Sequence, residues 1–210
     1  MKTLLLASIG DYVIKKGLKL LFPDVSRMKL AWITTATKGA VNRENLEKHK
    51  RLLEKEGYNF TEIDIEGKNI GELELLLGGM DAVLVEGGNA FYLLKAVRES
   101  GFDQVVKKLL DRGVVYVGAS AGSYVACPTI EMSTWKKPGE EKNNFGVTDL
   151  AAMNLVPFLV KAHYVPEMKE FLQEKIAKAG YPVKIITDEQ AILVKDDIIE
   201  LVGEGEELRI

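Results

Sequence analysis

Two short runs of uninterrupted apolar residues constrain the fold of this chain more than any other feature. The runs are Ala82–Val85 (AVLV) and Val114–Val117 (VVYV), and a glycine-containing turn follows each of them. A short apolar run without alternation is typical of a strand buried on both faces of a parallel sheet. Helical patterns follow both runs closely. Strands that alternate with helices predict βαβ units, and therefore an α/β fold with a mainly parallel sheet.

The remaining pattern extends this alternation along the whole chain. Helices are expected over residues 43–56, 70–77, 89–100 and 102–112. Further strands are expected over residues 1–8, 29–35, 60–65, 183–187, 191–195 and 198–202. Neither an internal repeat nor a linker-like change of composition divides the chain, so we expect one domain spanning residues 1–210.

Composition argues against several classes of protein. Lys and Arg number 28 against 31 Asp and Glu, so we expect no nucleic-acid partner and no membrane surface. Cys127 is the only cysteine, which leaves no intramolecular disulfide, and we interpret it as a small buried hydrophobe. The first apolar run is too short for a signal peptide, and none reaches the roughly 20 residues of a membrane helix. We expect a cytoplasmic protein without a metal or a cofactor.

The turn after the second apolar run carries a candidate nucleophile. It reads Gly118-Ala119-Ser120-Ala121-Gly122, which is the pattern G-x-S-x-G. Between a strand and a helix, this spacing forms a sharp turn that projects the serine hydroxyl. Side chains at the two glycine positions would collide with the turn, and the amide of Ala121 would point toward a substrate carbonyl. The alternative is a turn of small residues that only packs a helix on the sheet.

A serine nucleophile needs a base, and the chain contains two histidines. His49 lies near the edge of the apolar stripe of the helix expected over residues 43–56, and we interpret it as a boundary residue. His163 follows the apolar segment 155–162 and precedes a loop, which is typical of a strand end. That place suits a base that reaches Ser120, and a buried structural histidine is the alternative.

A third group should orient the imidazole, and here the sequence leaves several acids open. Asp188 and Glu189 follow the strand expected over residues 183–187, and a strand end holds a carboxylate more firmly than a loop does. Between the two candidate residues Ser120 and His163, the chain also offers Glu131, Glu140, Glu141 and Asp149.

A second glycine turn, Glu86-Gly87-Gly88-Asn89, follows the first apolar run. Two glycines let a backbone approach a ligand closely. The amides of Gly88 and Ala121 could therefore pair as an oxyanion hole, and we expect Asn89 to contact the substrate. The alternative is an ordinary helix-start turn. A phosphate-binding function is disfavoured because neither G-x-G-x-x-G nor a P-loop lysine is present.

These segments, in this order, resemble the peptidase E (aspartyl dipeptidase) family of serine peptidases, within a wider group that includes cyanophycinase. The resemblance is carried by Val85–Leu94 (VEGGNAFYLL), Tyr116–Ile130, Leu155 to His163, and Thr187–Ile192 (TDEQAI). It implies a flavodoxin-like three-layer sandwich related to the class I glutamine amidotransferases. It also implies Ser120 as nucleophile, His163 as base, and the amides of Gly88 and Ala121 as oxyanion donors.

This chain departs from the family pattern in two places. Where the family carries its triad aspartate, this chain has Ser133-Thr134-Trp135, so the third acid is Asp188 or, second, Glu131. The family reads an N-terminal aspartate with basic residues after its histidine. Here residues 164–179 contain lysines but no arginine, so a bidentate clamp on a substrate carboxylate is missing from that stretch.

We therefore expect a cofactor-independent serine peptidase that hydrolyses small peptides, with a dipeptidase-like specificity that could include N-terminal Asp. The expected partner is the small peptide substrate, and the expected state is a monomer or a homodimer. Two alternatives remain open. One is an esterase or amidase that uses the same nucleophile, and the other is an inactive binding protein on the same scaffold.

Overall fold

The computed structural model describes residues 1–40, 44–135 and 145–210. Within these residues, seven strands form one sheet in the order β3-β2-β4-β5-β1-β8-β9. Neighbouring strands among β1 to β5 run parallel, whereas β8 runs antiparallel to β1 and β9 antiparallel to β8. The strands are β1 (Thr3–Ala7), β2 (Lys29–Ile33), β3 (Asn59–Ile63), β4 (Ala82–Val85), β5 (Val115–Ala119), β8 (Gln190–Lys195) and β9 (Ile198–Gly203).

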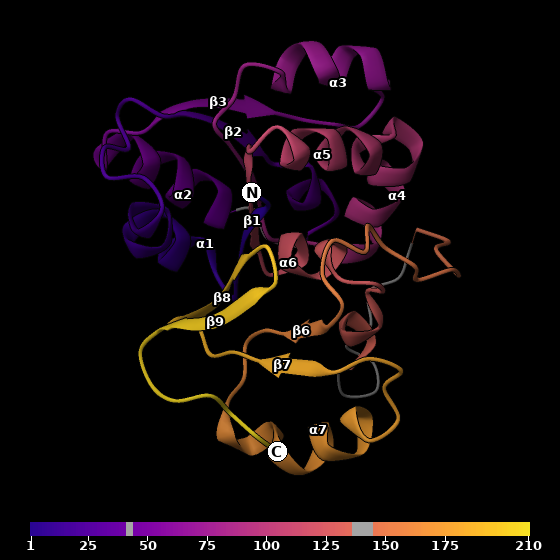
Figure 1. Ribbon diagram of the computed structural model, residues 1–210. Coiled ribbons are helices and arrows are strands. Elements are labelled where there is room, and N and C mark those ends of the chain that lie inside the picture. Colours follow the sequence, from indigo (N-terminus) through magenta and orange to yellow (C-terminus); the bar gives the residue numbers. More distant parts are fainter. Residues whose placement is uncertain (41–43, 136–144) are drawn as a thin grey trace.

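Helices cover both faces of this sheet, which confirms the expected three-layer α/β fold (Figure 1). One face carries α1 (Gly10–Tyr12), the π-helical η1 (Val13–Gly17), the 3-10 helix η2 (Leu18–Leu20) and α2 (Glu44–Lys55). The other carries α3 (Ile70–Leu77), α4 (Ala90–Ser100), α5 (Phe102–Asp111) and α6 (Ala121–Ala126). No helix in the described part of the chain is long and apolar enough to cross a membrane.

Alternation along the strands divides the core between these two layers. In β1, Leu4 and Leu6 pack with the layer of α3 to α6, while Leu5 and Ala7 pack with the layer of α1 and α2. This follows from the period of two residues in a strand, and both faces are apolar because both are covered. The uninterrupted apolar run of β4 is explained in the same way.

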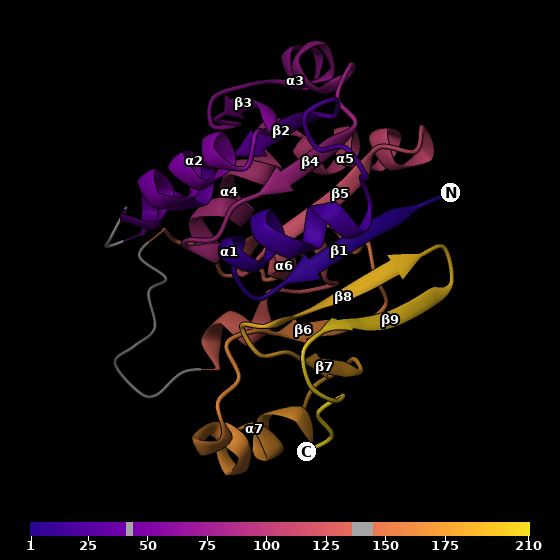
Figure 2. The same cartoon turned by 90° about the vertical axis from the view of Figure 1, so that its left-hand side faces the viewer.

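A smaller unit lies beside the side of the main sheet that β8 and β9 form (Figure 2). In it, β6 (Leu159–Lys161) pairs in parallel with β7 (Val183–Ile185), so β7 does not join the main sheet. The 3-10 helix η5 (Pro166–Met168) and α7 (Lys169–Ile176) connect these two strands. This unit brings the segments that follow β6 and β7 toward the carboxyl ends of β1 and β5. Two further 3-10 helices, η3 (Thr35–Gly39) and η4 (Glu131–Thr134), follow β2 and α6.

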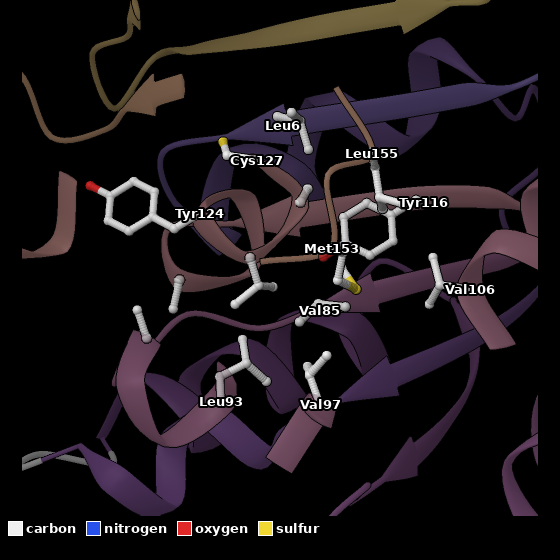
Figure 3. Packing of buried hydrophobic residues seen from close by; sticks show 14 of the residues in the cluster. Leu6, Val85, Leu93, Val97, Val106, Tyr116, Tyr124, Cys127, Met153 and Leu155 are labelled. Atoms are coloured by element: carbon white, nitrogen blue, oxygen red, sulfur yellow. The ribbon is translucent and has the colours of Figure 1, made fainter. Parts of the chain in front are cut away.

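Packing beneath α6 fixes this short helix on the sheet (Figure 3). The ring of Tyr116, from β5, is buried there, and its hydroxyl donates to the carbonyl oxygen of Gly122 at 2.7 Å. Cys127 is also buried, and burial raises the pKa of its thiol to about 12. A thiol with that pKa is a poor nucleophile at neutral pH, so the structural interpretation of Cys127 is confirmed.

Candidate active site

Ser120 occupies a sharp turn between β5 and α6. Its backbone has φ 49° and ψ −106°, a positive φ that is unfavourable for a residue with a side chain. Two backbone hydrogen bonds hold the turn: the Ser120 N–H donates to Ala7 O at 3.0 Å, and the Tyr124 N–H donates to Ser120 O at 3.0 Å. The strand, turn and helix expected from G-x-S-x-G are therefore present, and the hydroxyl lines a cavity.

The glycine requirement of this turn is confirmed. A Cβ added to Gly122 would lie 2.1 Å from Val85 O, which is backbone and cannot give way easily. We predict that Gly122→Ala lowers the free energy of unfolding by about 2 kcal/mol, because the added methyl forces the helix off the sheet. Urea denaturation measures this loss. Gly79→Ala is the matched control, since a Cβ there would meet nothing within 4 Å; equal midpoints for the two variants would contradict the prediction.

Three side chains form one hydrogen-bonded chain at this turn. Ser120 Oγ lies 2.9 Å from His163 Nε2, and His163 Nδ1 lies 2.9 Å from Asp188 Oδ1. A carboxylate at Nδ1 favours the tautomer that is protonated there, which leaves Nε2 free to accept the hydroxyl proton of Ser120. The three side chains thus meet the distance criterion for a nucleophile, a base and an orienting acid in catalysis by serine.

The three hydrogen-bonded side chains come from different parts of the fold. Ser120 follows β5 of the main sheet, whereas His163 lies just after β6 of the smaller sheet, with φ 60°. Asp188 lies in the turn between β7 and β8. The side chains of His163 and Asp188 are 45 % and 51 % exposed, so solvent reaches both. Water for a hydrolytic step can therefore enter the site.

The other acids that the sequence left as candidates for the third group either do not bond to His163 or fall outside the described residues. Glu131 begins η4 and makes no hydrogen bond with His163; burial raises the pKa of its carboxyl group. Asp149 pairs with an arginine of α4 at 3.0 Å. Glu140 and Glu141 lie outside the described residues. In the part of the chain that the structure describes, the carboxylate at the imidazole is that of Asp188.

The second glycine turn lies against the first. A Cβ added to Gly87 would lie 3.4 Å from the Cβ of Ser120. Gly88 has φ 151°, and a Cβ there would lie 2.3 Å from Ala36 O, so only glycine fits. The Gly88 amide donates no hydrogen bond to the described residues. This turn is therefore close enough to Ser120 to present an amide to the same ligand.

Asn89 has a structural role that the sequence also indicated. Its side-chain oxygen accepts hydrogen bonds from the amides of Phe91 and Tyr92, both at 3.0 Å, and so caps α4. The backbone N–H of Asn89 donates to Ala36 O at 2.9 Å. The residue also lines the cavity, so its contact with substrate stays a prediction.

His49 is not the boundary residue that its helix pattern indicates, because it is buried. Its Nε2 lies 3.0 Å from Asp11 Oδ2 and its Nδ1 lies 3.1 Å from Glu86 Oε2. Burial alone would lower the pKa of His49, but the close contacts with the carboxylates of Glu86 and Asp11 outweigh it and raise this pKa. Glu86 in turn accepts from the Gly87 amide at 2.9 Å, so the ion pair supports the second glycine turn.

The raised pKa of His49 predicts a pH-dependent contribution to stability. A group whose pKa is higher when folded stabilises the fold fully below its unfolded value, here about 6.5, and loses this effect as pH rises through the folded pKa. We therefore expect His49→Gln to cost more unfolding free energy at about pH 5.5 than at about pH 9. Denaturant titrations of both proteins at the two pH values measure the difference. An equal cost at both values would contradict this prediction.

Ser120 lines a cavity of about 1120 Å³. The two glycine turns, the end of β1, η4 and the segment after β6 form its wall. The wall is mixed, with apolar and aromatic side chains and a few polar groups, as is typical of a ligand site. The larger side chains that line it are Phe91, Tyr124, Met132, Trp135, Lys161, Met168 and Phe171. This volume can hold a small peptide.

Comparison with known proteins decides the family. The sequence pattern of peptidase family S51 matches residues 4–202, which is nearly the whole chain. The chain belongs to peptidase family S51. It is therefore a serine-type peptidase, a hydrolase, and the sequence resemblance to peptidase E is confirmed.

Individual relatives agree with this assignment. An uncharacterised peptidase of Listeria innocua is 30 % identical over 157 residues, which cover 72 % of this chain and 73 % of the relative. Peptidase E of a Nostoc species is 32 % identical over 143 residues, covering 68 % and 55 %. A crystal structure from Listeria monocytogenes, described as a candidate peptidase E, superposes with a TM-score of 0.84 and 26 % identity, covering 98 % of this chain and 100 % of that one.

Proposed function

We propose that this S51 peptidase hydrolyses small peptides through an acyl-enzyme, with Ser120 as nucleophile, His163 as general base and Asp188 as the orienting acid. The observation that carries the proposal is the chain of two hydrogen bonds, each 2.9 Å long, that joins these three side chains. Ser120 and His163 also line a cavity of about 1120 Å³, which supports the same function.

The geometry suggests the following order of steps. His163 accepts the hydroxyl proton through Nε2 while Ser120 Oγ attacks the carbonyl carbon of the scissile peptide bond. The amides of Gly88 and Ala121 stabilise the negative charge that develops on the carbonyl oxygen. His163 then gives the proton to the leaving amine. Water, activated by the same imidazole, hydrolyses the acyl-enzyme and restores Ser120.

The amide of Ala121 is well placed for this charge for a local reason. Ala121 is the first residue of α6, so its N–H has no acceptor within the helix. The partial positive charge of a helix N-terminus also favours an anion there. The Gly88 amide comes from the neighbouring turn, and together the two donors would contact one oxygen from two sides.

A substrate panel tests the proposed peptidase activity. The panel contains dipeptides with N-terminal Asp, Glu and Ala, longer peptides with blocked amino groups, and short acyl esters. We expect turnover of free dipeptides and much slower cleavage of longer peptides. Rapid cleavage of esters with no cleavage of any peptide would favour an esterase, and a folded protein that cleaves none of them would favour an inactive binding protein. Either result would contradict the proposal.

A further inference from the structure

Ser8 contacts both partners of the candidate nucleophile. It follows β1, and its side chain is completely buried. Its Oγ accepts a hydrogen bond from the His163 backbone N–H at 2.9 Å and donates one to Asp188 Oδ1. The same carboxylate oxygen lies 2.9 Å from His163 Nδ1. One hydroxyl thus links the main chain of the base to the side chain of the acid.

Both partners need an external support of this kind. His163 has φ 60°, which is an unfavourable conformation for a residue with a side chain. It follows the small sheet of β6 and β7, which does not pair with the main sheet. Asp188 lies in a turn, and about half of its side chain is exposed. Packing alone therefore holds neither group firmly relative to Ser120.

Hydrogen bonds from the end of β1 position all three groups. Ala7 O accepts the backbone N–H of Ser120 at 3.0 Å and the hydroxyl of Ser123 at 2.7 Å, which fixes the nucleophile turn. The next residue, Ser8, fixes His163 and Asp188. The last residue of one central strand and the residue that follows it thus align the candidate nucleophile with its base and its acid.

The hydroxyl of Ser8 also constrains the proton on the imidazole. A serine has one hydroxyl proton, and Ser8 donates it in the hydrogen bond to Asp188. Toward His163 Nδ1, 3.3 Å away, Ser8 Oγ can then act only as an acceptor. Both oxygen atoms near Nδ1, those of Ser8 and Asp188, therefore favour a proton on that nitrogen. Nε2 is left unprotonated and faces Ser120 Oγ.

We propose that Ser8 is a positioning residue for the peptidase reaction: it holds His163 and Asp188 in register with Ser120 and fixes the reactive tautomer of the imidazole. The inference rests on the proposed function and extends it. No other hydroxyl group in the described residues bridges this pair. Short sequence motifs cannot predict these contacts, because Ser8 precedes its partners by 155 and 180 residues.

Ser8→Ala tests the inference by steady-state kinetics on the best dipeptide of the panel. We expect kcat to fall roughly 10- to 100-fold with KM unchanged, because misalignment by a fraction of an ångström slows the chemical step and not binding. The rate of labelling by a small fluorophosphonate should fall by a similar factor, while the final label still reaches one per chain. Ser100→Ala is the matched control, because it removes another buried hydroxyl, one that donates to Ala96 O at 2.7 Å within α4.

The outcomes separate this inference from the proposed function. If Ser8→Ala keeps the wild-type kcat and labelling rate, Ser8 is not a positioning residue, and the peptidase mechanism stands. If kcat falls only in proportion to a loss of folded protein, measured by the label end point, the role is merely structural and the inference is wrong. If Ser8→Ala does not fold, Ser8→Cys takes the same measurements, since its thiol is a weak donor of similar shape. Failure of the proposed function would show instead in wild-type protein that takes no label.

Discussion

Replacing Ser120 with alanine is expected to lower kcat for peptide hydrolysis by roughly 10⁵- to 10⁶-fold. The substitution removes the only atom that can form the acyl-enzyme in the proposed mechanism, Ser120 Oγ, which lies 2.9 Å from His163 Nε2. Alanine already flanks this position and the helix start stays intact, so folding should be preserved. The measurement is the initial rate of dipeptide cleavage, with residual activity checked against a mock purification.

A matched serine in the same cavity controls for this result. The hydroxyl of Ser133 is buried and has no hydrogen-bond partner among the residues that the structure describes, although Ser133 lines the cavity. Ser133→Ala should therefore keep activity close to that of the wild type. A Ser120→Ala protein that turns over substrate at the wild-type rate would remove the serine mechanism, and equal losses in both variants would point to a cavity effect and not to a nucleophile.

Replacing Asp188 with asparagine is expected to lower kcat by roughly 10⁴-fold. An asparagine can present an amide N–H to His163 Nδ1, which favours a proton on Nε2 and blocks the acceptance of the Ser120 proton. The loss should appear in kcat, since the substitution preserves the shape of the side chain. Steady-state kinetics at saturating dipeptide measure it.

Two neighbouring acids serve as controls for this assignment. Glu189 is adjacent in sequence, but its exposed carboxylate faces Lys16 at 3.5 Å. Glu131, the alternative acid from the sequence, makes neither a hydrogen bond nor an ion pair with His163 in the described part of the chain. We expect Glu189→Gln and Glu131→Gln to retain most of the activity. A large loss in Glu131→Gln together with an active Asp188→Asn protein would transfer the acid's role to Glu131.

The main sheet could be predicted from the sequence because its strands have local sequence patterns. The buried strands β4 and β5 are uninterrupted apolar runs, and α3 has the expected bounds, Ile70–Leu77. The helical segment after β1 was not foreseen. Its π-helical stretch Val13–Gly17 has no strong period, and it is held by burial against α2 and the sheet. The helix α7 was not predicted either. Only Leu172 of this helix is completely buried, so its apolar pattern is weak.

Local sequence patterns also identify some residues of the candidate site, whereas others depend on contacts between distant parts of the chain. Ser120 follows from a five-residue motif, and His163 from a choice between two histidines. The choice of Asp188 depends on the pairing of β8 with β1, which sets Ala191 opposite Ala7 and brings the turn before β8 to the nucleophile. The contacts of Ser8 and of His49 also depend on residues that lie far apart in the sequence, by 155 and 180 residues for Ser8 and by 38 residues for His49 and Asp11. Only tertiary structure brings these groups together, so local patterns could not reveal them.

The most direct test of this account is the site and extent of labelling by a fluorophosphonate, read by mass spectrometry of the intact protein and of its peptides. The account predicts one label per chain, located on Ser120, and no label in Ser120→Ala or His163→Ala on the same timescale. A folded wild-type protein that takes no label, or that takes it on another residue, would contradict the assignment of Ser120 as the nucleophile.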